Sequence, residues 1–109
     1  MTVKVTRFDE SRAKISENGR RKVFDLAPEG LESNLLFHSI QMAADMVKEP
    51  ELNSVAKTLL ITNGSGVIEI EEVKTEVRAG DAVWLQAGST HRLSCGSSGI
   101  HYIVVRSKE

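Results

Sequence analysis

The stretch that decides the fold runs from residue 80 to residue 93 and reads Gly80-Asp81-Ala82-Val83-Trp84-Leu85-Gln86-Ala87-Gly88-Ser89-Thr90-His91-Arg92-Leu93. Its short apolar segment lies between two glycine-containing turns, Gly80-Asp81 and Ala87-Gly88. Gly88 can adopt a backbone conformation that other residues disfavour, and His91 opens the apolar segment that follows. The stretch therefore predicts two short β-strands joined by a tight turn, with His91 at the start of the second.

Similar turn signals recur along the second half of the chain, about every ten residues, which is typical of an all-β sandwich or barrel. Residues 63–66 and 96–99 are rich in Gly and Ser, and both predict turns between strands. The first of these is not a phosphate loop, because a strand and not a helix follows it. Glu71-Glu72 predicts a type I hairpin turn, since neither residue favours a positive φ. The predicted strands of this half are residues 57–62, 67–70, 75–78, 82–85, 91–94 and 100–106.

The first half has weaker patterns. Residues 3–7, 21–26 and 34–41 predict strands, and residues 28–30 predict a turn. Residues 41–48 fit a helix and a strand equally well, because Met42 and Met46 lie four residues apart, as on one helical face. The all-β context favours a strand there.

Composition limits the partners and the location of the protein. The 109 residues carry no composition shift, so residues 1–109 are expected to form one domain. Fourteen Lys and Arg against fifteen Asp and Glu give no basic footprint for nucleic acid, and the run Arg20-Arg21-Lys22 is interpreted as a solvated strand end. The single cysteine, Cys95, cannot form an intramolecular disulfide, and no apolar run is long enough for a membrane span. We expect a cytoplasmic protein that binds neither nucleic acid nor membrane.

The stretch from Gly80 to Cys95 resembles the second conserved motif of the cupin superfamily, G-x5-P-x-G-x2-H-x3-N. Gly80, Gly88 and His91 match the motif, whereas Gln86 replaces its proline and Cys95 its asparagine. The resemblance implies a small single-domain RmlC-like cupin, an all-β double-stranded β-helix or jelly-roll barrel. It also implies that two copies pair as a homodimer.

The first cupin motif, G-x5-HxH-x3,4-E-x6-G, is degenerate in this chain. With Gly64 as its final glycine, Lys57 stands at the position of the metal-binding glutamate. The HxH pair then falls on Glu51 and Asn53, or with the other permitted spacing on Pro50 and Leu52. Of the four metal ligands that the resemblance implies, only His91 remains.

This loss changes the expected chemistry. A divalent transition metal needs three or four converging donors, so His91 alone predicts no metal cofactor unless Glu51, His38 or His101 joins it. The ammonium group of Lys57 can instead bind a carboxylate or phosphate. The predicted ligand-binding residues are therefore His91, Lys57, Glu51 and His101.

Two functions remain open at this point. The first is a metal-free barrel that binds or senses a small molecule in an apolar pocket. The second, by resemblance, is an isomerase, epimerase or dioxygenase with a rearranged metal site.

Each histidine also has a structural interpretation, as a hydrogen-bonded barrel residue. Cys95 lies about 13 Å along a strand from His91, too far for a thiol–histidine pair, and is interpreted as a small buried hydrophobe.

Overall fold

A computed structural model of the chain describes residues 5–7, 10–26, 34–48 and 50–107. The described residues form antiparallel strands and short 3₁₀ turns, and no helix among them is long and apolar enough to cross a membrane. The all-β prediction is therefore confirmed. In chain order the elements are η1 (Glu10–Arg12), β1 (Lys14–Ser16), η2 (Glu17–Gly19), β2 (Arg21–Asp25), β3 (Leu35–Met42), β4 (Glu51–Leu52), β5 (Lys57–Ile70), β6 (Val73–Arg78), β7 (Ala82–Leu85) and β8 (Thr90–Ser107).

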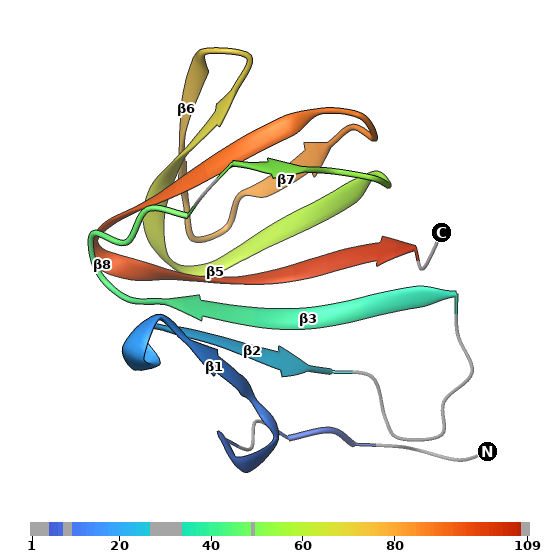
Figure 1. Ribbon diagram of the computed structural model, residues 1–109, viewed down its shortest axis with the longest axis vertical. Helices are drawn as coiled ribbons and strands as arrows, with labels where there is room; N and C mark the ends of the chain where they lie inside the picture. The colour runs from blue at the N-terminus through green and yellow to red at the C-terminus, as the bar shows by residue number, and fades with distance from the viewer. Residues whose placement is uncertain (1–4, 8–9, 27–33, 49, 108–109) are drawn as a thin grey trace.

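Two long strands, β5 and β8, pair with each other along most of their length and belong to both layers of the fold. The first part of β5 pairs with the last part of β8, and these parts lie with β1, β2, β3 and β7 in one layer. The remaining parts of β5 and β8 lie with β4 and β6 in the second layer. Figure 1 shows β8 folding back on itself, from orange to red, as it passes between the layers.

Glycines make this passage possible. A Cβ atom on Gly64 would lie 2.1 Å from the carbonyl oxygen of Gly99, and both glycines have positive φ. The register of β5 against β8 shifts on either side of Gly64. The predicted turns at residues 63–66 and 96–99 are therefore wrong, because both segments are bends inside continuous strands. Glycine favours a close approach of two backbones as readily as it favours a turn.

The other strand predictions of the second half correspond to β6, β7 and parts of β5 and β8, and residues 21–26 and 34–41 correspond to β2 and β3. Of the predicted strand at residues 3–7, the described residues 5–7 are not in a strand, and the rest lies outside the described residues, as does the predicted turn at 28–30. The very short strands β1 and β4 gave no sequence signal.

Residues 43–48 form neither a helix nor a strand. The chain turns at Ala44-Asp45, where Asp45 has positive φ, and then makes a single β-bridge from Val47 to Ser94. Met42 and Met46 are both buried, so their four-residue spacing reflects a turn that returns the chain to the core. The strand predicted there is wrong beyond Met42.

The hairpin between β5 and β6 has a two-residue loop, because Ile70 pairs directly with Val73. Both loop residues, Glu71 and Glu72, have positive φ (49° and 70°), as in a primed type I′ turn, so the predicted type I turn is wrong. The twist of the paired strands favours primed turns strongly enough to hold two glutamates in a conformation that side chains disfavour.

The core lies between the two layers. Its buried members are Ile40, Met42, Met46, Leu59, Ile61, Ile68, Val77, Leu85, Leu93, Ile100, Tyr102 and Val104. They come from β3, β5, β6, β7 and β8 and from the turn after β3, so the two long strands supply most of the apolar contacts. The layers are thereby fixed relative to each other, and so are the side chains that face the space between them.

We predict that replacing the hairpin loop by Asn-Gly (Glu71→Asn/Glu72→Gly) stabilises the protein by about 1 kcal/mol, because both new residues accept positive φ. Urea denaturation measures the change. The pair Glu71→Gln/Glu72→Gln serves as control, since it removes the same charges but keeps the strained backbone. Equal stability of the two double variants would show that the loop conformation carries no strain.

Candidate functional site

A cavity of about 290 Å³ lies between the layers and collects most of the polar side chains that face inward. Strand alternation places them there: Tyr102, Val104 and Arg106 face inward from β8, and His38 and Ile40 face inward from β3. The full lining is Lys14, Arg21, Val23, His38, Ile40, Lys48, Glu51, Lys57, Leu59, His91, Tyr102, Val104 and Arg106. The cavity thus combines an apolar surface with cationic groups.

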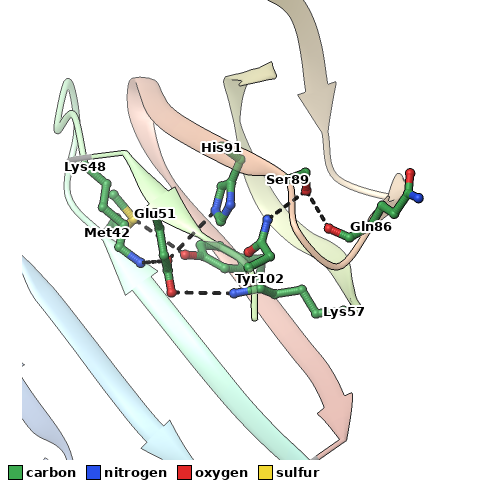
Figure 2. Close-up of polar contacts among 9 residues, drawn as sticks. Met42, Lys48, Glu51, Lys57, Gln86, Ser89, His91 and Tyr102 are labelled. Carbon is green, nitrogen blue, oxygen red and sulfur yellow. Dashed lines mark hydrogen bonds and ion pairs between the residues drawn. The ribbon is translucent and has the colours of Figure 1, made fainter. Parts of the chain in front are cut away.

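Glu51 is the centre of a polar cluster on one side of this cavity (Figure 2). It lies on β4 directly opposite His91 of β8. The Nζ atom of Lys48 lies 2.6 Å from Glu51 Oε2, and the Nζ atom of Lys57 lies 3.5 Å from Oε1. The Nε2 atom of His91 lies 4.0 Å from Oε2. One carboxylate is therefore shared between two ammonium groups and an imidazole.

The protonation states follow from burial and from these neighbours. Burial alone would raise the pKa of Glu51, but the hydrogen bond and charge of Lys48, together with Lys57, lower it to about 2. Burial lowers the pKa of Lys57, although Glu51 opposes this effect. Burial and then the charge of Lys57 lower the pKa of His91. At neutral pH the Glu51 carboxylate is ionised and the His91 imidazole is neutral, so their 4.0 Å contact is not an ion pair.

Two buried nitrogens of the cavity have no hydrogen-bond partner among the described residues, Nδ1 of His91 and Nε of Arg21. His91 is only 5% exposed. Buried polar atoms are normally paired, so such atoms in a cavity are free to bind a ligand. The Tyr102 hydroxyl, also in this cavity, donates to Met42 Sδ (3.8 Å) and is near Arg21. Burial raises the pKa of Tyr102 to about 12, so it stays a neutral phenol.

Asn53, at the second position of the degenerate HxH pair, has a structural role. Its backbone N–H donates to the carbonyl of Ser89 and its carbonyl accepts from Gly88, while its side-chain amide donates to Ser89 Oγ. The side chain is almost fully buried. Asn53 therefore fixes the turn before β8 and, through it, the position of His91.

Three of the four predicted ligand-binding residues lie around the cavity, namely Glu51, Lys57 and His91. His101 does not line it, because Tyr102 faces inward and its neighbour on β8 faces the opposite side of the layer. His38 does line the cavity, and burial lowers its pKa.

Sequence reasoning missed Lys14, Arg21, Lys48, Tyr102 and Arg106. Arg21 was interpreted as part of a solvated strand end, but it lines the cavity. Its two-residue spacing from the apolar Val23 was a signal that both side chains face inward.

The side chains present do not fit the metal that the resemblance to cupins implies. Within the described part of the chain, no three His, Cys, Asp or Glu side chains converge in a way that could hold a metal ion. Glu51 and His91 would supply two donors, fewer than a divalent transition metal requires. Lys57 contacts the Glu51 oxygen at 3.5 Å, and its ammonium group repels a cation at that place.

A larger hollow, of about 630 Å³, lies elsewhere, between β5, β6 and β8. Its lining includes Cys95, whose pKa is raised by burial. Cys95 packs against the core, but it is half-buried and not fully buried as the sequence predicted. None of the unpartnered buried polar side-chain atoms of the described residues belongs to its lining. The smaller cavity, whose lining includes Arg21 and His91, is therefore the stronger candidate site.

Comparison with solved structures shows the fold. A cupin 2 conserved barrel domain protein from Salinispora arenicola superposes with a TM-score of 0.84 at 14% identity, covering 99% of this chain and 91% of that one. An RmlC-like cupin from Shewanella frigidimarina gives a TM-score of 0.75 at 16% identity, covering 94% and 89%. A cupin superfamily protein from Desulfitobacterium hafniense gives 0.75 at 15% identity, covering 98% and 100%. The RmlC-like cupin fold predicted from the second motif is confirmed. No protein-family model matches the sequence, and no curated protein matches it.

We predict that NMR titration of the imidazole signals gives His91 a pKa below 6.5, because the ring is buried and near Lys57. Lys57→Gln should raise this pKa by removing a positive charge, and Glu51→Gln should lower it further by removing a negative one. Lys74→Gln, on the exposed strand β6, is the control and should leave it unchanged. A pKa at or above 6.5 in the unmodified protein would contradict this account of the site.

Proposed function

We propose that this chain, which has the cupin fold, is a metal-free protein that binds or senses a small organic anion in the cavity between its layers. The observation that carries the proposal is the charge of the lining. Among the described residues, it holds one acidic side chain, Glu51, and five cationic ones, Lys14, Arg21, Lys48, Lys57 and Arg106. The whole chain has slightly more acidic than basic residues. Positive charge is therefore concentrated in the cavity.

Lys57 has the central part in this proposal. It stands at the sequence position of the cupin metal-binding glutamate, and its ammonium group supplies positive charge close to His91 without a metal. An ammonium group binds a carboxylate or phosphate as a compact charge, and the guanidinium groups of Arg21 and Arg106 can add paired hydrogen bonds. Neutral His91 and Tyr102 supply further polar contacts.

The remaining lining limits the kind of anion. Val23, Ile40, Leu59 and Val104 form an apolar surface in the same cavity, which favours a ligand with a carbon skeleton over a bare inorganic ion. A volume of about 290 Å³ is at the lower limit for small-molecule pockets, so the ligand is small.

The enzyme alternative receives less support from the same residues. Oxidative cupin chemistry requires a metal with an open coordination position, which the donor set here does not fit. With a pKa of about 2, Glu51 is a weak base at neutral pH. Of the two side chains, His91 alone would then act as the general acid or base.

We predict that small carboxylates raise the melting temperature of the protein and that Lys57→Ala weakens their binding about tenfold or more, through loss of a charge-assisted hydrogen bond. Titration calorimetry with glutarate measures the affinity, which should also fall as salt is added. Lys74→Ala on β6 is the matched control and should bind normally. Failure of small anions to bind, or equal effects of the two lysine variants, would refute the proposal.

We also propose that two copies form a homodimer through the outer face of β3, β5, β7 and β8 in the first layer. The outward positions of β3, β5, β7 and β8 include no Lys, Arg, Asp or Glu, and they are Leu35, Phe37, Ser39, Gln41, Thr58, Leu60, Thr62, Ala82, Trp84, His101, Ile103, Val105 and Ser107. Trp84 is 63% exposed there. An uncharged face cannot form ion pairs with a charged partner. The same face of a second copy, related by a two-fold axis, is also uncharged and can pack against it.

Sedimentation velocity tests this assembly. We predict that the unmodified protein sediments as a dimer at micromolar concentration and that Trp84→Glu sediments as a folded monomer, because the new charge would be buried in the interface. Trp84→Phe, which keeps an apolar ring, should remain dimeric. A monomeric unmodified protein, or a dimer that survives Trp84→Glu, would refute the interface.

A further inference from the structure

Three cationic side chains of the cavity define two levels along the strands, whereas Lys48 lies beside Glu51, and Lys14, opposite Val23, lies at the level of Ile40 and Tyr102. Arg106 pairs with Lys57 across β8 and β5, so these two define one level. Arg21 pairs with Met42, which in turn pairs with Ile100 of β8. Ile100 lies six residues before Arg106, so the backbones of the two levels are about 20 Å apart along the strand direction. Lys57 and Arg106 therefore lie at one end of the cavity and Arg21 at the other.

The residues between these levels are mostly apolar. Counting inward along β8 from Arg106, the next side chain that faces the cavity is Val104, which pairs with Leu59, and the one after is Tyr102, which pairs with Ile40. The order along the cavity is thus a cationic pair, then Val104 and Leu59 with His38, then Tyr102 and Ile40 with Val23 and Lys14, and then Arg21. The long Lys and Arg side chains can lean toward each other and shorten the distance between the charged groups.

At the end of the cavity formed by Arg21, the described residues leave a hydrogen-bond donor without a partner. Its Nε atom is buried without a hydrogen-bond partner among the described residues, and its guanidinium is near the neutral hydroxyl of Tyr102. A guanidinium presents paired N–H donors that match the two oxygens of a carboxylate, and the Tyr102 hydroxyl, which donates to Met42 Sδ, can turn to the same group. At the other end, Lys57 and Arg106 present two cations, and Glu51 offsets part of the charge of Lys57.

We infer that the ligand carries two acidic groups joined by an apolar chain, as in a small aliphatic dicarboxylate, with one group at Lys57 and Arg106 and the other at Arg21 and Tyr102. This inference rests on the proposed anion-binding function and narrows its ligand class. Two acidic groups neutralise both ends of the cavity, and the carbon chain lies on Val104, Leu59 and Ile40. A monoanion would leave the half-buried positive charge of one end without an acidic group of the ligand.

Titration calorimetry with two matched series tests the inference. The first series is malonate, succinate, glutarate, adipate and pimelate, and the second is the monocarboxylates of the same carbon numbers. We expect an optimum chain length at which the dicarboxylate binds at least tenfold more tightly than its monocarboxylate. Arg21→Gln and Arg106→Gln should each abolish this preference, whereas Arg92→Gln, which is exposed and outside the cavity, should keep it.

The outcomes separate this inference from the function on which it rests. If dicarboxylates and monocarboxylates bind equally and both lose affinity in Lys57→Ala, the anion site stands and the two-ended ligand is refuted. If no member of either series binds, both are refuted. Thermal melts of each variant show whether it is folded, and Arg21→Lys, which keeps the charge, should retain part of the preference even if Arg21→Gln unfolds.

Discussion

The close crossing of β5 and β8 at Gly64 and Gly99 is the constraint on which the rest of the structure depends. The carbonyl oxygen of Gly99 occupies the place where a side chain on Gly64 would begin, so only glycine permits the two backbones to approach and bend there. The bend lets each long strand contribute to both layers. As a result Lys57, in the first part of β5, faces the cavity opposite His91, in the first part of β8.

The polar cluster lies where the cupin motifs would place metal ligands, but it is built from other side chains. With Lys57 at the glutamate position, the remaining carboxylate, Glu51, has two ammonium neighbours and a low pKa. His91 keeps its position, because Asn53 fixes the turn before it, but its surroundings keep the imidazole neutral. The geometry of the barrel is thus retained while the electrostatics of its interior favour an anion over a cation.

The sequence was informative where spacing is strict and ambiguous where one residue type serves two purposes. Gly80, Gly88 and His91 predicted the barrel, and the motif spacing led to Lys57 and Glu51. The glycines at the crossing were read as turns, because a sequence does not distinguish a turn from a bend in which a distant strand approaches. Arg21 and Arg106 were missed for a related reason: charged residues at strand ends usually face water, and only the register of β2, β3 and β8 places these two in one cavity.

The most direct test of the central claim, that positive side chains replace a metal in this barrel, is X-ray anomalous scattering from crystals soaked in selenate. The account predicts a selenium peak inside the cavity, about 4 Å from the nitrogen of Lys57, Arg106 or Arg21, so that a selenate oxygen is within hydrogen-bond distance, and no transition-metal peak beside His91 in unsoaked crystals. A metal peak coordinated by His91 and Glu51, or selenate bound only outside the cavity, would contradict it.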